Sequence, residues 1–420
     1  MKNPRVQLAV GIAISVLFLY LAMRGVNPRD LWMALTQFNW WWSIPFVALT
    51  LLSMWVRAWR WHYFLLPTAN LPTRKLWDPL MAGFAINGLL PARIGEFARA
   101  FVLARQEKLP FPRVFGTIVV ERIFDTLVLL GLLAYVFSTL EIDPNLSYPY
   151  STRGEMNKWI PAVVLVAIGA GLFLWGQRAR QRSAQDGSSS RLASVLTPLG
   201  VVLALGGVLV AWLAPAVIGY GADYEINGEA LKSLSTKVAT LSVIMLVGAA
   251  MLVWPAACRV IHTIIARFPL LPDGLRRFAS SIVTTFSEGM QSLRSPRLIA
   301  IVTVQSLMVW MLVAWSMQIM PYGFANMRAM SISEATALMV ITCLAILIPA
   351  APGYWGLMEL GIKFGMVILA VDTDPNRVLA YALIVHALQY FPITGIGLLS
   401  LWKSQISMTE IRNEKPGASG

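Results

Sequence analysis

Apolar runs long enough to cross a membrane recur along almost the whole chain, and this feature restricts the fold more than any other. A helix needs about 20 mostly apolar residues to cross roughly 30 Å of hydrocarbon. Hydrophobic residues make up 57% of the 420 residues and charged residues 13%, so the polar segments are too few to form a second, water-soluble core. We predict an all-α, polytopic integral membrane protein with one transmembrane domain over 1–402 and about eight crossings, near 6–23, 42–58, 114–137, 159–176, 196–218, 236–257, 298–320 and 378–401.

Positive charge is distributed unevenly between these runs, and positively charged segments tend to stay on the cytoplasmic side. Lys and Arg together number nine in 57–113, four in 177–195 and six in 258–297, but two in 138–158, one in 219–235 and one in 321–333. The count predicts that both termini are cytoplasmic, in the cytoplasmic (inner) membrane of a bacterium or archaeon. Residues 177–195 are polar and rich in Ser, so we expect a flexible cytoplasmic loop there and a cytoplasmic tail over 403–420.

The charge count requires two further stretches, 77–105 and 334–371, to enter the membrane and leave it on the same side. We predict that each is a re-entrant helical hairpin, with two full crossings in 334–371 as the alternative. The stretches share a local pattern, because "LLPARIGE" begins at residue 89 and "LIPAAPGYWGLMELG" begins at residue 347. The hairpins lie in different halves of the chain and enter from opposite faces, which is the pattern of an inverted repeat.

Helix-breaking residues interrupt both hairpins, at Pro91 in the first and at Pro349, Pro352 and Gly353 in the second. A proline frees backbone groups that hydrocarbon cannot satisfy, so such a break is tolerated inside the protein or beside a water-filled cavity. A helix that begins at the break points unpaired N–H groups into that cavity, which favours an anion.

Charged residues follow the first break. Arg93, Glu96 and Arg99 recur every three residues, and in a helix they share one face. Together with Asn87, the two arginines are candidates to bind an anionic substrate, and Glu96 is a candidate to bind a proton or pair with an arginine.

The next crossing contains "VVERIFDTLVLLGLL", with Glu121, Arg122 and Asp125. Each charge near the bilayer centre costs about 2.5–3.5 kcal/mol, so we expect all three to face the protein interior or an aqueous path. Arg122 and Asp125 can pair at i,i+3, whereas Glu121 and Asp125 place two acids on one stripe that needs a cation, such as an arginine of the first hairpin. A substrate or proton site and a purely structural network of ion pairs are both compatible with this pattern.

Other charged or polar residues in the apolar runs are weaker candidates. Arg57 and Arg60 are expected to extend to lipid headgroups at the end of the second crossing, with substrate binding as the alternative. Lys363 can neutralise Glu359 one turn away. A cavity lining and a simple hydrogen bond between helices are equally compatible with His386, Gln389 and Tyr390.

The block "NGLLPARIGEFARAFVLARQ", followed by "VVERIFD", resembles the signature of the lysylphosphatidylglycerol synthase transmembrane-region family, which is also described as flippase-like. In that family a Pro-x-Arg-x-Gly-Glu-x-x-Arg stretch precedes a Glu-Arg-x-x-Asp helix, and "IPAAPGYWGLMELG" resembles its second motif. The resemblance implies membrane lipid handling, and it implies that the functional residues are Arg93, Glu96, Arg99, Glu121, Arg122, Asp125 and Glu359. The chain departs from the family in lacking a synthase domain and in carrying Tyr354 and Trp355 after the second Pro-Gly, so aminoacylation is not implied and another headgroup is expected.

These observations favour a lipid translocase that is not an enzyme and needs no cofactor or metal. In this hypothesis Arg93, Arg99 and Arg122 hold the phosphate of a phospholipid, polyprenyl phosphate or lipid-linked saccharide, and a proton on Glu96, Glu121 or Asp125 compensates its charge. Nucleic acid is not an expected partner, and the sequence is compatible with a homo-oligomer. The alternatives are a transferase acting on a lipid-linked sugar, with Asp372 and Asp374 as metal ligands, and a non-transporting partner of a lipid-modifying enzyme.

Overall fold

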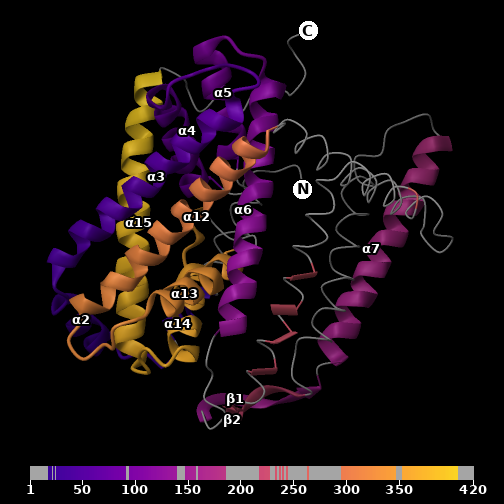
Figure 1. Cartoon of the computed structure of the whole chain (residues 1–420). Helices are drawn as coiled ribbons and strands as arrows, with labels where there is room; N and C mark the ends of the chain where they lie inside the picture. The colour runs from indigo at the N-terminus through magenta and orange to yellow at the C-terminus, as the bar shows by residue number, and fades with distance from the viewer. Residues whose placement is uncertain are drawn as a thin grey trace. The chain divides into compact units, whose positions relative to one another are not determined.

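The computed structural model describes residues 25–90, 94–139, 147–157, 159–185, 217–227, 295–346 and 352–404, with scattered residues at 18–23 and between 232 and 263. The contacts divide the chain into two compact units, residues 1–136 with 292–420 and residues 137–291. The first unit contains the helices that carry the predicted motifs (Figure 1). Three predicted hairpin residues, Pro91, Arg93 and Pro349, lie outside the described residues, as do most of the predicted crossings at 6–23, 196–218 and 236–257 and nearly all of the predicted tail.

The first unit is a bundle of long helices. Its main elements are α3 (Ser43–Leu65), α4 (Thr73–Leu89), α6 (Phe111–Thr139), α12 (Pro296–Ile319) and α15 (Pro375–Ser404), and the short helix α2 (Pro28–Thr36) packs against α15. Helix α15 lies along α4, and α12 lies along α3, as Figure 1 shows. Between them they bury Trp61, Met81, Val309 and Tyr381, which form part of the core of the unit.

Long helices cover the predicted crossings near 42–58, 114–137, 298–320 and 378–401. Among the described residues, two segments are long and apolar enough to cross a membrane, Pro296–Gly323 with mean hydropathy 2.1 and Pro375–Ser404 with 1.6. The first includes the short 3-10 helix η2 (Met320–Gly323) that continues α12. The predominantly helical fold class is therefore confirmed and is consistent with a membrane protein, while the number of crossings and the inverted repeat remain predictions.

The first predicted hairpin consists of α4 and α5 (Gly95–Glu107), which pack against each other. The Oδ1 atom of Asn87 accepts a hydrogen bond from the backbone N–H of Gly95 at 2.7 Å, so a side chain from the end of the first arm caps the start of the second. The arms cross at Gly83 and Gly95, because a Cβ atom on either glycine would meet the backbone carbonyl of the other. Backbone contact this close is possible only without side chains at the crossing.

The second predicted hairpin consists of α13 (Ile332–Ala345), the 3-10 turn η3 (Pro352–Tyr354) and α14 (Leu357–Ile368). The two helices contain 14 and 12 residues, or about 21 and 18 Å at 1.5 Å per residue. Each is shorter than the hydrocarbon core of roughly 30 Å. The break lies where Pro352 and Gly353 predicted it, and Gly353 (φ 75°) and Gly356 (φ 90°) adopt the left-handed backbone conformation that glycine tolerates.

The second unit contains a feature that the sequence did not predict. Strands β1 (Ser147–Asn157) and β2 (Val217–Asn227) form a two-stranded antiparallel sheet in which Ser147 pairs with Asn227 and Asn157 with Val217. Pro149 and Gly154 in β1 and Gly219 and Gly221 in β2 weaken the local strand propensity, so the long-range pairing is what defines these segments as strands. Helix α7 (Trp159–Gln185) covers the predicted crossing 159–176 and continues into the stretch that we expected to be a loop from residue 177.

Candidate functional site: a buried network of arginines and carboxylates

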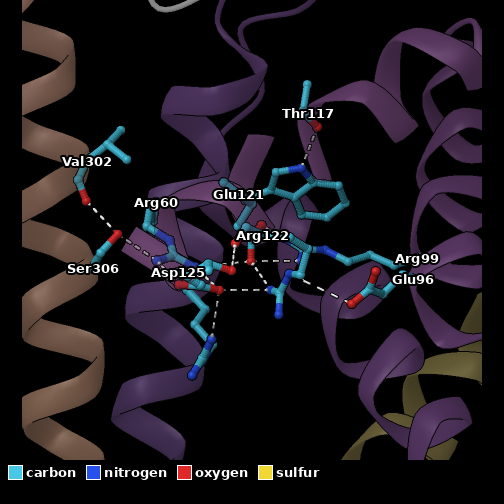
Figure 2. A network of polar contacts seen from close by, with 12 residues as sticks. Arg60, Glu96, Arg99, Thr117, Glu121, Arg122, Asp125, Val302 and Ser306 are labelled. Carbon is cyan, nitrogen blue, oxygen red and sulfur yellow. Dashed lines mark hydrogen bonds and ion pairs between the residues drawn. The ribbon is translucent and has the colours of Figure 1, made fainter. Parts of the chain in front are cut away.

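Four helices of the first unit supply one connected set of charged side chains (Figure 2). Arg57 and Arg60 come from α3, Glu96 and Arg99 from α5, and Glu121, Arg122 and Asp125 from α6; Ser306 of α12 joins them through a hydroxyl group. Spacings of three or four residues place the members from each helix on one face. We call these seven charged residues the arginine network.

Arg60 is the hub of the arginine network. Its Nη1 atom donates to Asp125 Oδ1 at 2.6 Å and to Ser306 Oγ at 2.7 Å, and its Nη2 atom donates to Glu121 Oε1 at 3.1 Å. The Arg60 and Glu121 side chains are fully buried. One guanidinium thus bridges the two acids that α6 stacks on a single stripe, and α12 is tied to the same group.

Arg99 and Arg122 hold the other side of the acidic stripe. Arg99 Nη2 lies 2.9 Å from Glu121 Oε2, and its guanidinium carbon lies 3.7 Å from the centroid of the Trp61 ring. The indole N–H of Trp61 donates to Thr117 Oγ1 at 3.0 Å, which fixes the ring under the charge. Arg122 Nη2 lies 2.7 Å from Glu121 Oε1 and 3.2 Å from Asp125 Oδ2.

Positive charge exceeds negative charge in the arginine network. Four guanidinium groups face two buried carboxylates, and the third acid, Glu96, is 30% exposed and lies 3.8 Å from Arg122. Arg57 has the weakest pairing: its Nη1 atom is 3.7 Å from Asp125 Oδ2, and its guanidinium carbon lies 5.0 Å from the Trp310 ring centroid. The buried Nε atoms of all four arginines have no hydrogen-bond partner among the described residues.

This imbalance has a direct chemical consequence. An incompletely paired charge in the protein interior is costly, and an anion with several oxygen acceptors relieves that cost. The side chains of Arg122 and Glu96 are 36% and 30% exposed, so the arginine network reaches the protein surface on their side. Chemically, the arrangement is able to pair with an anion at this exposed side.

A second polar site lies at the break of the second hairpin. Glu359 Oε1 is 2.7 Å from His386 Nδ1, and Glu359 Oε2 accepts the N–H of Gly356 at 2.7 Å. His386 Nε2 lies 2.8 Å from the carbonyl oxygen of Gly353, and the imidazole stacks on Trp355 with centroids 4.1 Å apart. We call Glu359 and His386 the hairpin pair.

The tips of the two hairpins meet on α15. The hydroxyl group of Tyr390 donates to the carbonyl oxygen of Gly88, at the end of the first arm of the first hairpin, at 3.2 Å. The same ring packs against the second break, because a Cβ atom on Gly353 would lie 2.9 Å from Tyr390 Cε2. Helix α4 also contacts η3. The end of α4, which leads into the first motif, therefore lies beside the turn η3 of the second motif.

The predicted pairing within the crossing is confirmed, and several other predictions need correction. Arg122 and Asp125 pair as expected, and Arg99 of the first hairpin reaches Glu121. Arg57 and Arg60 do not extend to headgroups, because their exposed fractions are 6% and 0%. Their i,i+3 spacing matches the i,i+4 acids of α6, and that complementarity is the signal that points to a shared site.

Two further corrections concern the second hairpin and the helix after it. The side chain that contacts Glu359 is His386, and Lys363 donates to the carbonyl oxygen of Ala22 at 3.0 Å. The Asp372 carboxylate accepts two hydrogen bonds from Arg377, at 2.6 and 2.9 Å, and Asp374 Oδ1 accepts the N–H of Asn376. These contacts organise the start of α15 and do not favour metal binding by Asp372 and Asp374.

Comparison with known proteins links residues 8–195, which include all seven members of the arginine network, to a known family. A family model described as lysylphosphatidylglycerol synthase TM region matches these residues and confirms the resemblance that the motifs predicted. The chain is also similar to a protein named Glycosyltransferase AglD of Haloferax volcanii, with 22% identity over 428 aligned positions that cover 96% of this chain and 55% of the relative. The chain thus spans about half the length of this curated relative. We predicted that the chain is not an enzyme, and the similarity to a named glycosyltransferase overturns that prediction.

Proposed function

From the match of residues 8–195 to the family model described as lysylphosphatidylglycerol synthase TM region, we propose that the chain translocates an anionic, phosphate-containing lipid between the leaflets of a membrane. The excess positive charge of the arginine network carries the proposal. A lipid phosphate offers several oxygens to guanidinium groups, which bind them in bidentate fashion. The acyl or prenyl chains remain in the hydrocarbon.

Arg122 and Arg57 have different roles in this proposal. Arg122 is part exposed, so it contacts the phosphate first. Arg57 is buried and lies 3.7 Å from its nearest carboxylate oxygen, so it gains a full partner when the phosphate moves inward. Arg60 and Arg99, held by Glu121 and Asp125, position the acids and the helices that carry them.

The hairpins provide a means of exposing the site to either leaflet. Two short, broken hairpins whose tips meet at Tyr390 resemble the discontinuous helices that surround transporter sites. We propose that they form an inverted repeat and that relative movement of the two hairpins alternates access. A singly charged phosphate changes energy by about 2.3 kcal/mol per 100 mV on crossing the membrane, so a compensating proton makes transport less dependent on voltage.

The test is native mass spectrometry of the gently extracted protein, with Arg57→Gln, Arg122→Gln and a double variant. We expect an anionic lipid on the wild type and its loss from the double variant. Lys75→Gln is the matched control, because Lys75 is 53% exposed and its ion pair with Glu107 lies outside the arginine network. An unchanged lipid complement in the folded double variant would contradict phosphate binding at this site.

A second candidate function is transfer of a sugar to or from a lipid-linked acceptor, and the similarity to Glycosyltransferase AglD is the observation that favours it. A lipid-linked sugar also presents phosphate, so the same arginines can anchor either substrate. Purified protein in liposomes distinguishes the candidates, because translocation changes the leaflet of an intact labelled lipid, whereas transfer changes its mass. The Arg57→Gln variant is expected to weaken whichever activity is found.

A further inference from the structure

We propose that Glu359 and His386 form a one-proton lock that holds the break of the second hairpin closed, and that gain or loss of this proton releases the hairpin during transport. The coupling step rests on the translocase function proposed above, whereas the lock itself rests only on the contacts of the hairpin pair. Those contacts join both ends of the break, Gly353 and Gly356, to side chains on two different helices.

The hydrogen-bond partners determine how many protons the hairpin pair holds. His386 Nε2 faces the carbonyl oxygen of Gly353 at 2.8 Å, and a carbonyl only accepts, so Nε2 carries a hydrogen. Glu359 Oε2 accepts the Gly356 N–H, so that oxygen carries none. The remaining contact, 2.7 Å between His386 Nδ1 and Glu359 Oε1, needs one hydrogen between the two atoms.

Only the state with one shared proton satisfies every contact. If a second proton binds, both Nδ1 and the carboxyl group carry hydrogens, and either the contact between them or the Gly356 N–H bond is lost. If the shared proton leaves, the lone pair of Nδ1 faces a carboxylate. Because the hairpin pair is buried, neither defect is screened by water, and each one weakens the hold on the break.

The lock acts on a segment whose backbone conformation depends on glycine. Gly353 and Gly356 both have positive φ, and Trp355 between them stacks on the imidazole. Tyr390, one turn after His386 on α15, contacts Gly88 of the first hairpin and packs on Gly353. Release of the hairpin pair therefore frees the second break at the point where the tips of both hairpins meet.

Other titratable or charged groups lie on the described elements that pack against the hairpin pair. Several have their own contacts: Glu334 of α13 with Arg328, Tyr381 of α15 with the Met317 carbonyl, Tyr390 with the Gly88 carbonyl, Lys363 with the Ala22 carbonyl, Asp78 of α4 with Ser400, Lys75 of α4 with Glu107 and Arg377 of α15 with Asp372. The same elements carry Tyr354 of η3, Cys343 of α13, Arg74 of α4 and Lys403 of α15. The hairpin pair differs from these groups because its proton content decides whether two backbone contacts of the break persist.

The test is hydrogen exchange of the Gly356 amide in nanodiscs across a range of pH, with each rate normalised to the intrinsic rate. In the wild type we expect the Gly356 amide to be most protected within a window of pH. Outside this window its protection should fall at least about tenfold, because one buried hydrogen bond is lost. In Glu359→Gln the side-chain oxygen still accepts the Gly356 N–H, and the side-chain amide donates a hydrogen to His386 Nδ1. The Gly356 amide of this variant should therefore stay protected at pH values above the wild-type window. His386→Phe keeps the stack on Trp355 but removes both contacts, so it should lose protection at every pH.

Glu334→Gln is the matched control, because Glu334 occupies the same N3 position in the capping box at the start of α13. It should leave the Gly356 profile unchanged. A wild-type profile that is flat, or that Glu359→Gln leaves unaltered, would overturn the lock.

Transport by the same proteins separates this inference from the proposed function. A pH-dependent lock in a protein that moves no phosphate lipid would refute the translocase and leave the lock standing. Transport whose dependence on an imposed proton gradient is the same in the wild type and Glu359→Gln would refute the coupling and leave the translocase standing.

Discussion

Arg60 Nη1 lies 2.6 Å from Asp125 Oδ1, although 65 residues separate the two in the sequence. Both side chains are buried, and Ser306 of a third helix contacts the same nitrogen. The contact therefore joins α3, α6 and α12 at one point. We expect substitutions in the arginine network to differ in their effect on stability. A large loss of stability identifies a residue that holds the fold, and a small loss identifies a residue that is available to a ligand.

Replacement of Arg60 with Met should destabilise the protein severely. Removing one member of a buried ion pair leaves charges without a partner, and the free energy of unfolding falls by about 3–5 kcal/mol. Chemical unfolding in detergent measures the change. Arg328→Met is the control, because that exposed arginine pairs with Glu334 at the surface, where a pair contributes about 1 kcal/mol or less. Equal effects of the two substitutions would refute the hub role of Arg60.

Replacement of Arg57 with Gln should leave the stability of the protein nearly unchanged but weaken the binding of the lipid. Arg57 lies 3.7 Å from its nearest carboxylate, so its loss removes little internal pairing but reduces the excess positive charge. We expect stability within about 1 kcal/mol of the wild type, in the range of most mild substitutions. Retention of the co-purified anionic lipid is measured by mass spectrometry on the same sample, and full retention would assign Arg57 a structural role.

Substitution of Gly95 with Ala should disrupt the first hairpin. The added Cβ would meet the Gly83 carbonyl oxygen and the Asn87 side chain, and overpacking of this kind costs about 1–3 kcal/mol. Gly116→Ala in α6 is a matched control, since a Cβ there meets nothing within 4 Å and alanine favours the helix. The midpoint of thermal unfolding should fall for Gly95→Ala. For Gly116→Ala it should rise or stay the same.

Substitution of Tyr390 should affect both hairpins together. Tyr390→Phe removes only the hydrogen bond to the Gly88 carbonyl, which costs about 0.5–1.5 kcal/mol. Tyr390→Ala also removes the ring that packs on Gly353, so hydrogen exchange should increase at residues 86–90 and at 353–356. An increase confined to one of the two segments would show that the tips are not coupled through this ring.

Local sequence pattern predicted most of the helices and the positions of their breaks. The apolar runs near 42–58, 298–320 and 378–401 are helices, and the second break falls at Pro352 and Gly353. The Arg122–Asp125 pair was also predictable, because a helix fixes the separation of residues three apart. The strands β1 and β2 were not predicted, because 59 residues lie between them and glycines interrupt both segments.

The sequence by itself determined that this chain is a helical membrane protein with charge placed beside two helix breaks, because hydrophobicity, helical spacing and proline geometry act over a few residues. Only the tertiary structure decided which charges meet. Arg60 with Asp125, Glu359 with His386 and Tyr390 with Gly88 are separated by 65, 27 and 302 residues. Their partners depend on how whole helices pack and on which buried charges must be neutralised together, and that balance belongs to the assembled bundle and not to any one segment.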